Sequence, residues 1–285
     1  YRGETALKCG NTLSFDTYFN SFSYTKYRDY TKADDVTFSC KFKGRVSIAL
    51  CYFDGEEHII FQKEAESFAE LHTDLSWLPE RGFLYPKIIA ITDCVFIEGG
   101  YYSECEPSKI KASIAICTYK REQFALKNIK LLRSRKFSFI ERVFVVDNGK
   151  TLDSSALSDD YIKILPNKNL GGSGGFTRGI IEAYNESCSH VILMDDDVEF
   201  FPETLEHITI FISILKTEYI DSCLSAAMLL LSEKEPYIQW EMGGNWTGRC
   251  IESRKHNADI REKSVLMDNI DNNYVKYGAW WCFCM

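Results

Sequence analysis

The sequence predicts an α/β domain with a mostly parallel sheet, preceded by an all-β sandwich domain. Residues 1–107 contain short runs of aromatic and β-branched residues separated by turn residues, which is typical of a sandwich. In residues 108–285, continuous apolar runs alternate with amphipathic helical patterns, which is typical of strands covered by helices on both faces. A chain of 285 residues is long enough for two such domains.

The strand candidates of the first domain are VTFSCKF, RVSIALCYF, HIIFQKE and KIIAITDCVFI. We expect turns at Asp54-Gly55 and at Gly99-Gly100, because aspartate and glycine favour turn conformations. Residues 104–109 include Pro107 and are predicted to link the two domains.

The strand candidates of the second domain are ASIAIC, RVFVVD, YIKIL, HVILMD and CLSAAMLLL. Three helices are predicted between or after them from residues that recur on one helical face. These faces are Phe124, Asn128, Ile129 and Leu132; Phe176, Ile180 and Tyr184; and Leu205, Ile208, Ile212 and Leu215.

Charge and cysteine content narrow the class of protein. The net charge of −8 argues against a nucleic-acid binder, whose affinity would rest on basic residues. The eleven cysteines are scattered and no secretory signal precedes them, so we expect a cytoplasmic protein, with the inner face of the cytoplasmic membrane as one location. Cys282 and Cys284 are interpreted as buried thiols rather than zinc ligands. No run approaches the roughly 20 apolar residues of a membrane span, which leaves peripheral membrane association open.

The string VILMDDDVEF places three carboxylates directly after a buried strand. Asp195, Asp196 and Asp197 would then lie at the carboxyl end of the strand, where open α/β sheets bind ligands. Adjacent like charges repel one another, and Mg²⁺ or Mn²⁺ shared with a diphosphate would relieve the repulsion. The alternative is a solvated acidic turn before a helix.

Polar residues follow two other strands. Thr118, Tyr119 and Arg121 come after ASIAIC, and Asp147 and Asn148 come after RVFVVD. A hydroxyl, a guanidinium and backbone N–H groups at a helix N-terminus suit an anion or a base edge. The alternatives are a helix cap and an ordinary turn.

The segment NKNLGGSGGFTRG has four glycines in five residues and leads into an amphipathic helix. Such a run predicts a backbone that approaches a ligand closely. It matches neither a Walker loop nor a dinucleotide-binding fingerprint. Arg178 is placed to reach back toward a phosphate, and a flexible surface loop is the alternative.

These motifs, in this order, resemble the family-two glycosyltransferases of the GT-A fold. The match is closer to bacterial galactofuranosyltransferases, which share the NLGGSGGFTR-like loop, the DDD motif, a tryptophan pair and an N-terminal β-sandwich. The resemblance implies an inverting, metal-dependent hexosyltransferase that moves galactofuranose from UDP-galactofuranose to a cell-surface glycan of the O-antigen or cell-wall galactan type. Another nucleotide-sugar donor, as in a rhamnosyltransferase, is the alternative within this class.

The resemblance also implies roles for individual residues. Thr118, Tyr119 and Arg121 would bind the uridine and its phosphates, and Asp147 and Asn148 would lie near the base or ribose. The donor pocket would be shaped by Asn169, Gly171, Gly172, Ser173, Gly174, Gly175 and Arg178. Asp195 and Asp197 would bind Mn²⁺ or Mg²⁺, Asp196 would approach the sugar, and Trp280 and Trp281 would line a site for a glycan or lipid-linked glycan. Homo-oligomerisation is left open.

In the galactofuranosyltransferases the catalytic base follows the tryptophan pair, and a histidine metal ligand comes later. We therefore expect both beyond Met285 and a second domain that is incomplete at its C-terminus. Asp268 and Asp271 are interpreted as loop carboxylates, and Gly243 to Trp246 as an acceptor-side loop or a turn.

A non-catalytic calcium- or carbohydrate-binding module is the alternative from another class of protein. Asp195, Asp197, Glu199 and Glu206 fit the spacing of EF-hand ligands, but Phe200 occupies the position that requires glycine.

Overall fold

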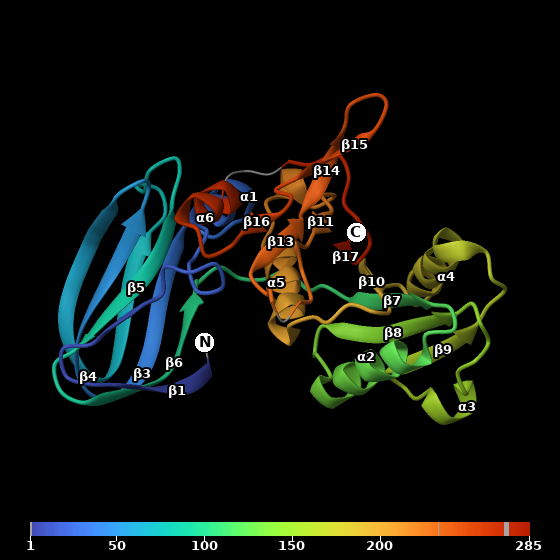
Figure 1. Cartoon of the computed structure of the whole chain (residues 1–285), viewed down its shortest axis with the longest axis horizontal. Coiled ribbons are helices and arrows are strands. Elements are labelled where there is room, and N and C mark those ends of the chain that lie inside the picture. Colours follow the sequence, from blue (N-terminus) through green and yellow to red (C-terminus); the bar gives the residue numbers. More distant parts are fainter. Residues whose placement is uncertain (1, 233, 271–273) are drawn as a thin grey trace. The chain divides into compact units, whose positions relative to one another are not determined.

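The computed structural model describes residues 2–232, 234–270 and 274–285. It divides into two compact units (Figure 1). The first unit consists of Tyr1–Glu106, Ile214–Lys216 and Asn257–Tyr274, and the second of Pro107–Ser213, Thr217–His256 and Val275–Met285. Residues 257–274, which we expected in the second domain, therefore belong with the first.

The first unit is built on one antiparallel sheet. Its elements are β1 Arg2–Leu7, β2 Thr12–Ser14, α1 Tyr24–Tyr30, β3 Asp35–Phe53, β4 Glu57–Asp74, β5 Phe83–Ala90 and β6 Cys94–Tyr102. The strand order is β1-β6-β3-β5-β2, and β4 pairs with β3. All six strands thus join in a single hydrogen-bonded sheet, and the expected two-sheet sandwich is not confirmed.

The long strand β3 explains most differences from the predicted strands. It joins two runs that we predicted as separate strands, with a shift of register between Lys41 and Arg45. Gly44 lies at this irregularity with φ +102°, a conformation that favours glycine. Gly99 and Gly100 lie within β6 opposite β3, so the predicted turn there is wrong. The predicted turn at Asp54-Gly55 is confirmed between β3 and β4.

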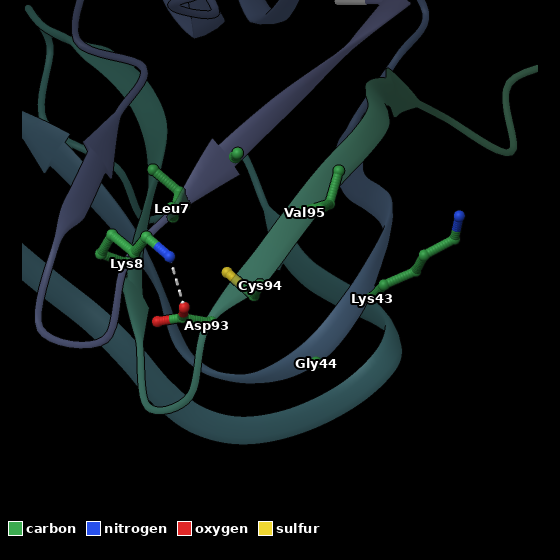
Figure 2. Close-up of a pocket in the computed structure, with 8 residues that line it drawn as sticks. Leu7, Lys8, Lys43, Gly44, Asp93, Cys94 and Val95 are labelled. Atoms are coloured by element: carbon green, nitrogen blue, oxygen red, sulfur yellow. Dashed lines mark hydrogen bonds and ion pairs between the residues drawn. The ribbon is translucent and has the colours of Figure 1, made fainter.

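A depression of about 370 Å³ lies beside Gly44 (Figure 2). Lys8, Lys43 and Asp93 are among its lining residues, and Lys8 Nζ lies 2.7 Å from Asp93 Oδ2. All of its lining residues belong to the first unit, so the strand ends of the second unit's sheet do not form this depression.

A late segment of the chain completes the core of the first unit. It contains β16 Ala258–Asp259 and α6 Lys263–Ile270. Leu266, Met267 and Ile270 are buried in the same apolar cluster as the sheet. Helices α1 and α6 lie side by side (Figure 1), and Lys26 Nζ donates to the carbonyl of Asn269 at 2.6 Å. Asp268 lies in α6 rather than in a loop, and Asp271 lies outside the described residues.

The second unit is built on a mostly parallel sheet. Its strands, in spatial order, are β11 Leu224–Ser225, β17 Cys282–Cys284, β10 His190–Asp195, β7 Ala112–Thr118, β8 Ile140–Asp147 and β9 Ile162–Pro166. The last four strands are parallel, and β17 is antiparallel to β10. The remaining elements are α2 Glu122–Arg135, α3 Ser154–Leu157, α4 Gly171–Asn185, α5 Pro202–Ser213, the 3₁₀ turn η1 Thr217–Tyr219, β12 Met228–Leu229, β13 Ile238–Glu241, β14 Gly243–Trp246 and β15 Ile251–Arg254. The α/β class is therefore confirmed, while the GT-A fold stays a prediction.

Some predicted elements of this unit need correction. The run CLSAAMLLL forms only the short strands β11 and β12, and the segment from Gly243 to Trp246 is strand β14 rather than a loop. Phe124 is 40% exposed on α2 and Tyr184 is 81% exposed on α4, so neither belongs to a buried face. Small residues replace them there: Ala125 on α2, and Gly175, Gly179 and Ala183 on α4.

All eleven cysteines are described and free, and Cys282 and Cys284 are buried. Burial raises the pKa of both thiols to about 12. Among the helices of the described chain, none combines the length and apolarity that a membrane crossing requires.

Candidate functional site at the carboxyl ends of the parallel strands

The predicted site residues lie at one edge of the second unit's sheet. Thr118 pairs with Asp147 across β7 and β8, and Cys117 pairs with Asp195 across β7 and β10. Because these strands are parallel, the segments that follow them leave the sheet at the same edge. The sequence therefore placed these motifs correctly relative to the sheet.

The three aspartates differ in their surroundings. Asp196 is buried and accepts a hydrogen bond of 2.6 Å from Thr118 Oγ1. Thr118 is also buried. These two side chains bond to each other, so this arrangement does not support the implied contacts of Thr118 with uridine and of Asp196 with the sugar. Instead, they fasten the acidic turn to the end of β7.

Asp195 carries a negative charge that only the more distant Arg121 partly offsets. Within the described residues, its carboxylate has no hydrogen bond or ion pair. Partial burial, followed by repulsion from Asp197 and Asp196, raises its pKa to about 6. A divalent cation would remove this repulsion, and a carboxylate without competing donors is free to bind one.

Two basic side chains of the α2 segment contact the outer part of the turn. Arg121 Nη1 donates to Asp197 Oδ2 and lies 3.6 Å from Asp196 Oδ1. Lys127 Nζ donates to Glu199. Asp197 thus engages Nη1 of Arg121, and the guanidinium carries further N–H donors that suit a phosphate. Both pairs are exposed, where solvent screens charges strongly and ion pairs are weak.

The two carboxylates proposed as metal ligands fit a hard cation such as Mn²⁺ or Mg²⁺. Across the described residues, no group of three or more His, Cys, Asp and Glu side chains could hold a metal. Asp196 points inward, which leaves Asp195 and Asp197 from the triplet. Magnesium is commonly held by one or two carboxylates together with substrate phosphates.

Asp147 and Asn148 shape the edge rather than face a ligand. The Asp147 carboxylate is fully buried and accepts from the backbone N–H groups of Gly149, Thr151 and Leu152 at 2.7–2.9 Å. Asn148 is buried too, and its Nδ2 donates to the carbonyl of Gly171 at 3.1 Å. The implied contact of Asp147 with base or ribose is therefore not supported, because its oxygens are used inside the protein.

The glycine-rich segment is the first turn of a helix, not a loop. Helix α4 begins at Gly171, which has φ +73° and donates its backbone N–H to Asn169 Oδ1 at 3.0 Å. No atom outside the local chain lies within 4 Å of a Cβ built on Gly171 or on Gly172, and both are exposed together with Asn169 and Ser173. The first turn of a helix presents free N–H groups and a positive dipole end, which suit an anion.

The other glycines of this segment serve packing. A Cβ on Gly175 would lie 2.2 Å from Cys117 Sγ, and a Cβ on Gly179 would lie 2.6 Å from the Cβ of Ala115. These two glycines let α4 lie directly on β7. A Cβ on Gly174 would meet the Cβ of Leu170 at 2.4 Å. The predicted donor contacts thus stay reasonable for Gly171, Gly172 and Ser173, but Gly174 and Gly175 have structural neighbours instead.

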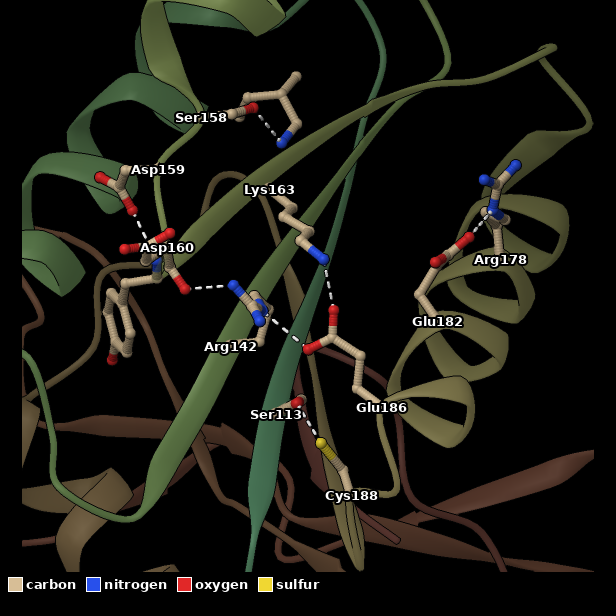
Figure 3. A network of polar contacts seen from close by, with 12 residues as sticks. Ser113, Arg142, Ser158, Asp159, Asp160, Lys163, Arg178, Glu182, Glu186 and Cys188 are labelled. Atoms are coloured by element: carbon tan, nitrogen blue, oxygen red, sulfur yellow. Dashed lines mark hydrogen bonds and ion pairs between the residues drawn. The ribbon is translucent and has the colours of Figure 1, made fainter.

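Arg178 does not reach back to the start of its helix. Its Nε donates to Glu182 Oε1 at 2.7 Å, one turn further along α4 (Figure 3). Glu186 at the end of the same helix accepts from Arg142 and Lys163. The direction of the Arg178 side chain contradicts its predicted role at a phosphate.

The aromatic candidates lie beside the acidic turn. Cys282 pairs with Met194, so Trp281 lies next to the strand end that carries Asp195. Trp280 is 38% exposed and packs edge-on against Phe176, near the start of α4, with ring centroids 5.4 Å apart. Trp281 donates its indole N–H to the carbonyl of Ala226. Trp280 and the exposed Tyr119 therefore offer aromatic surface at this edge.

The sequence reasoning missed the role of Asn128. We placed it correctly on the buried face of α2, where it donates to the carbonyls of Asp196 and Val198. A polar residue on an otherwise apolar helix face was the available signal, since a buried amide requires partners. The EF-hand alternative is wrong, because Asp195 ends strand β10 whereas an EF-hand loop follows a helix.

Family models match both parts of the chain. The model for glycosyl transferase family 2 matches residues 113–217, and the model for the galactofuranosyltransferase 2 N-terminal domain matches residues 1–104. These two matches correspond to the two strand-rich regions described above.

Two curated relatives match over nearly the whole chain. Galactofuranosyltransferase GlfT2 of Mycolicibacterium smegmatis is 26% identical over 318 residues, covering 99% of this chain and 48% of the relative. The protein of the same name from Mycobacterium tuberculosis is 26% identical over 324 residues, with the same coverage. The chain thus spans about half the length of these relatives.

One solved structure that is similar to part of the chain is a family GH115 4-O-methyl-α-glucuronidase. The similarity covers 35% of this chain and 14% of that one, at 12% identity and a TM-score of 0.24. A score this low carries no argument about fold. The two family models and the curated relatives together support a family-two glycosyltransferase related to the galactofuranosyltransferases.

Proposed function

We propose that the chain forms the donor-binding part of an inverting, metal-dependent glycosyltransferase that uses UDP-galactofuranose. The observation that carries the proposal is the acidic turn. Within the described residues Asp195 has no hydrogen bond or ion pair, its pKa is raised to about 6, and it lies at the sheet edge that also carries the exposed first turn of α4. A cation and a diphosphate would satisfy these two features together.

Each exposed group has a role in this proposal. The backbone N–H groups of Gly172 and Ser173 would donate to the diphosphate, and Asp195 and Asp197 would hold Mn²⁺ or Mg²⁺. The cation supplies positive charge that stabilises the departing diphosphate. Arg121 would add a charged donor to the same oxygens through the N–H groups that Asp197 does not engage. Tyr119 would stack on the uracil and Trp280 on the acceptor sugar.

The reaction would be a direct displacement at the anomeric carbon. A carboxylate base would take the proton of the acceptor hydroxyl while UDP leaves. We assign no described residue to this base, because the turn carboxylates are committed to the cation and to Thr118.

The similarity to the two galactofuranosyltransferases supports galactofuranose as the transferred sugar. We propose a cell-surface glycan, or its lipid-linked precursor, as the acceptor, with O-antigen and cell-wall galactan as the glycan types. We also propose that transfer takes place at the inner face of the cytoplasmic membrane, with which the protein would associate peripherally. The same proposal includes a homo-oligomer.

Calorimetry tests the donor site. UDP should bind in the presence of Mn²⁺ and bind much more weakly after chelation. The Arg178→Ala variant is the matched control, because Arg178 pairs with Glu182 away from the start of α4 and should bind UDP as the wild type does. UDP-galactofuranose should compete with UDP more strongly than other UDP-hexoses. UDP affinity that does not depend on the cation would refute the metal-dependent mechanism.

A further inference from the structure

The backbone of the acidic turn is held by one buried side chain from α2. Asn128 is 3% exposed, and its Nδ2 donates to the carbonyl of Asp196 at 3.0 Å and to that of Val198 at 3.1 Å. A side-chain amide has two hydrogens on this nitrogen, so one group can serve both carbonyls. These two carbonyls flank Asp197 in the sequence.

This contact fixes the direction of the carboxylates. The peptide group before Asp197 and the one after Val198 are held, and the Asp197 side chain is exposed and contacts Arg121. The Thr118 bond holds Asp196 inward. Asn128 thus holds the backbone of the turn, and Thr118 holds the side chain of Asp196. Asp195 and Asp197, the two neighbours of Asp196, take their orientation from this fixed turn.

Asn128 differs from the other α2 contacts in its burial. Arg121 and Lys127 reach the turn through exposed ion pairs, which solvent screens. The neighbours of Asn128 on the buried face, Ala125, Ile129 and Leu132, are apolar. Asparagine is a poorer helix former than leucine, so helix propensity does not favour it at this position.

We propose that Asn128 is a positioning residue for the divalent-cation site. It touches neither the cation nor the donor and acts through the backbone of residues 196–198. The inference rests on the proposed function, because it assigns Asp195 and Asp197 to the cation. Partners that orient metal ligands typically change metal affinity about 10- to 100-fold when they are lost.

The test compares Asn128→Leu, which keeps the side-chain size and removes the donor, with Thr209→Val as a matched control. Thr209 is equally buried on α5, and its Oγ1 donates within its own helix, to the carbonyls of Leu205 and Glu206. Both variants lose buried hydrogen bonds, but only Asn128 contacts the acidic turn. The measurements are the Mn²⁺ concentration that half-saturates UDP binding, and the melting temperature without Mn²⁺.

We expect Asn128→Leu to raise the half-saturating Mn²⁺ concentration about tenfold or more. Thr209→Val should leave this concentration unchanged, although its melting temperature should fall about as much as that of Asn128→Leu. Asn128→Gln keeps an amide but displaces it, so it should fold even where the leucine variant does not and should still raise the Mn²⁺ requirement. Equal Mn²⁺ curves for the wild type and a folded Asn128 variant would overturn the inference and leave the proposed function intact. A wild-type protein without Mn²⁺-dependent UDP binding would refute both.

Discussion

Replacing Gly179 with alanine should destabilise the protein without changing the surface at the proposed donor site. Gly179 is buried where α4 lies on β7. The new Cβ would lie 2.6 Å from the Cβ of Ala115, whereas ordinary contacts begin near 3.4 Å. Ala115 has no flexible side chain that could move aside, so the helix and the sheet must separate by nearly an ångström.

The magnitude follows from two opposing terms. Overpacking of this kind costs about 1–3 kcal/mol, and alanine recovers about 0.5–1 kcal/mol of the cost of glycine in a helix. We expect a net loss of about 1–2 kcal/mol. In a protein of this size that corresponds to a decrease of roughly 2–8 °C in melting temperature.

Gly172→Ala is the matched control, since it is the same substitution in the same helix. No atom outside the local chain lies within 4 Å of its Cβ position, and the residue is exposed, so the melting temperature should be unchanged or slightly higher. Its methyl group would nevertheless stand at the turn proposed to meet the diphosphate, so UDP affinity should fall. Thermal melts and UDP titrations of both variants check this. A wild-type melting temperature for Gly179→Ala would refute the packing argument.

Three further predictions concern the acidic turn and the first unit. Asp195→Asn removes an unfavourable charge, so the free energy of unfolding of the metal-free protein should rise by about 1 kcal/mol at pH 7 after allowance for screening. The same variant should lose Mn²⁺-dependent UDP binding. Because the pKa of Asp195 is raised in the folded protein, wild-type stability should fall between about pH 4 and pH 6 as pH rises, and denaturant titrations of the variant should lack this fall. Asp197→Ala should abolish Mn²⁺-dependent UDP binding with an unchanged circular dichroism spectrum, and near-wild-type binding in saturating Mn²⁺ would contradict its role as a ligand. Residues 108–285 produced alone should aggregate or bind a hydrophobic dye, because Leu266, Met267 and Ile270 lose the sheet that covers them; a monodisperse fragment with no dye binding would count against this.

The sequence predicted the parallel strands and their polar ends well, because buried strands have continuous apolar runs and parallel strands present their carboxyl ends at one edge. Asp195 and Tyr119 lie where their motifs indicated. Strand lengths in the first unit were less predictable. Whether two apolar runs form one strand or two depends on a register shift at Gly44, which is set by the partner strands and leaves little trace in the local sequence.

The direction of individual side chains could not be predicted. Asp147 and Asp196 looked like ligand groups because one ends a strand and the other directly follows one, yet both are buried and bonded internally. A carboxylate at a strand end can bind a ligand or hold the loop that follows, and sequence alone does not separate the two. Similarly, the glycine run predicted a close approach of the backbone, but for Gly175 and Gly179 the approaching partner is the sheet itself.

The late helix α6 has a consequence for synthesis on the ribosome. Thr25 Oγ1 donates to the carbonyl of Ile270, a contact that spans 245 positions of the chain. Domains usually fold in the order in which they are translated, the N-terminal one first. Here the N-terminal sheet emerges early but lacks Leu266, Met267 and Ile270 until almost all of the second unit has been made. The unit that is translated first is therefore expected to complete its folding last, and during that delay its uncovered apolar face is the surface on which a chaperone would act.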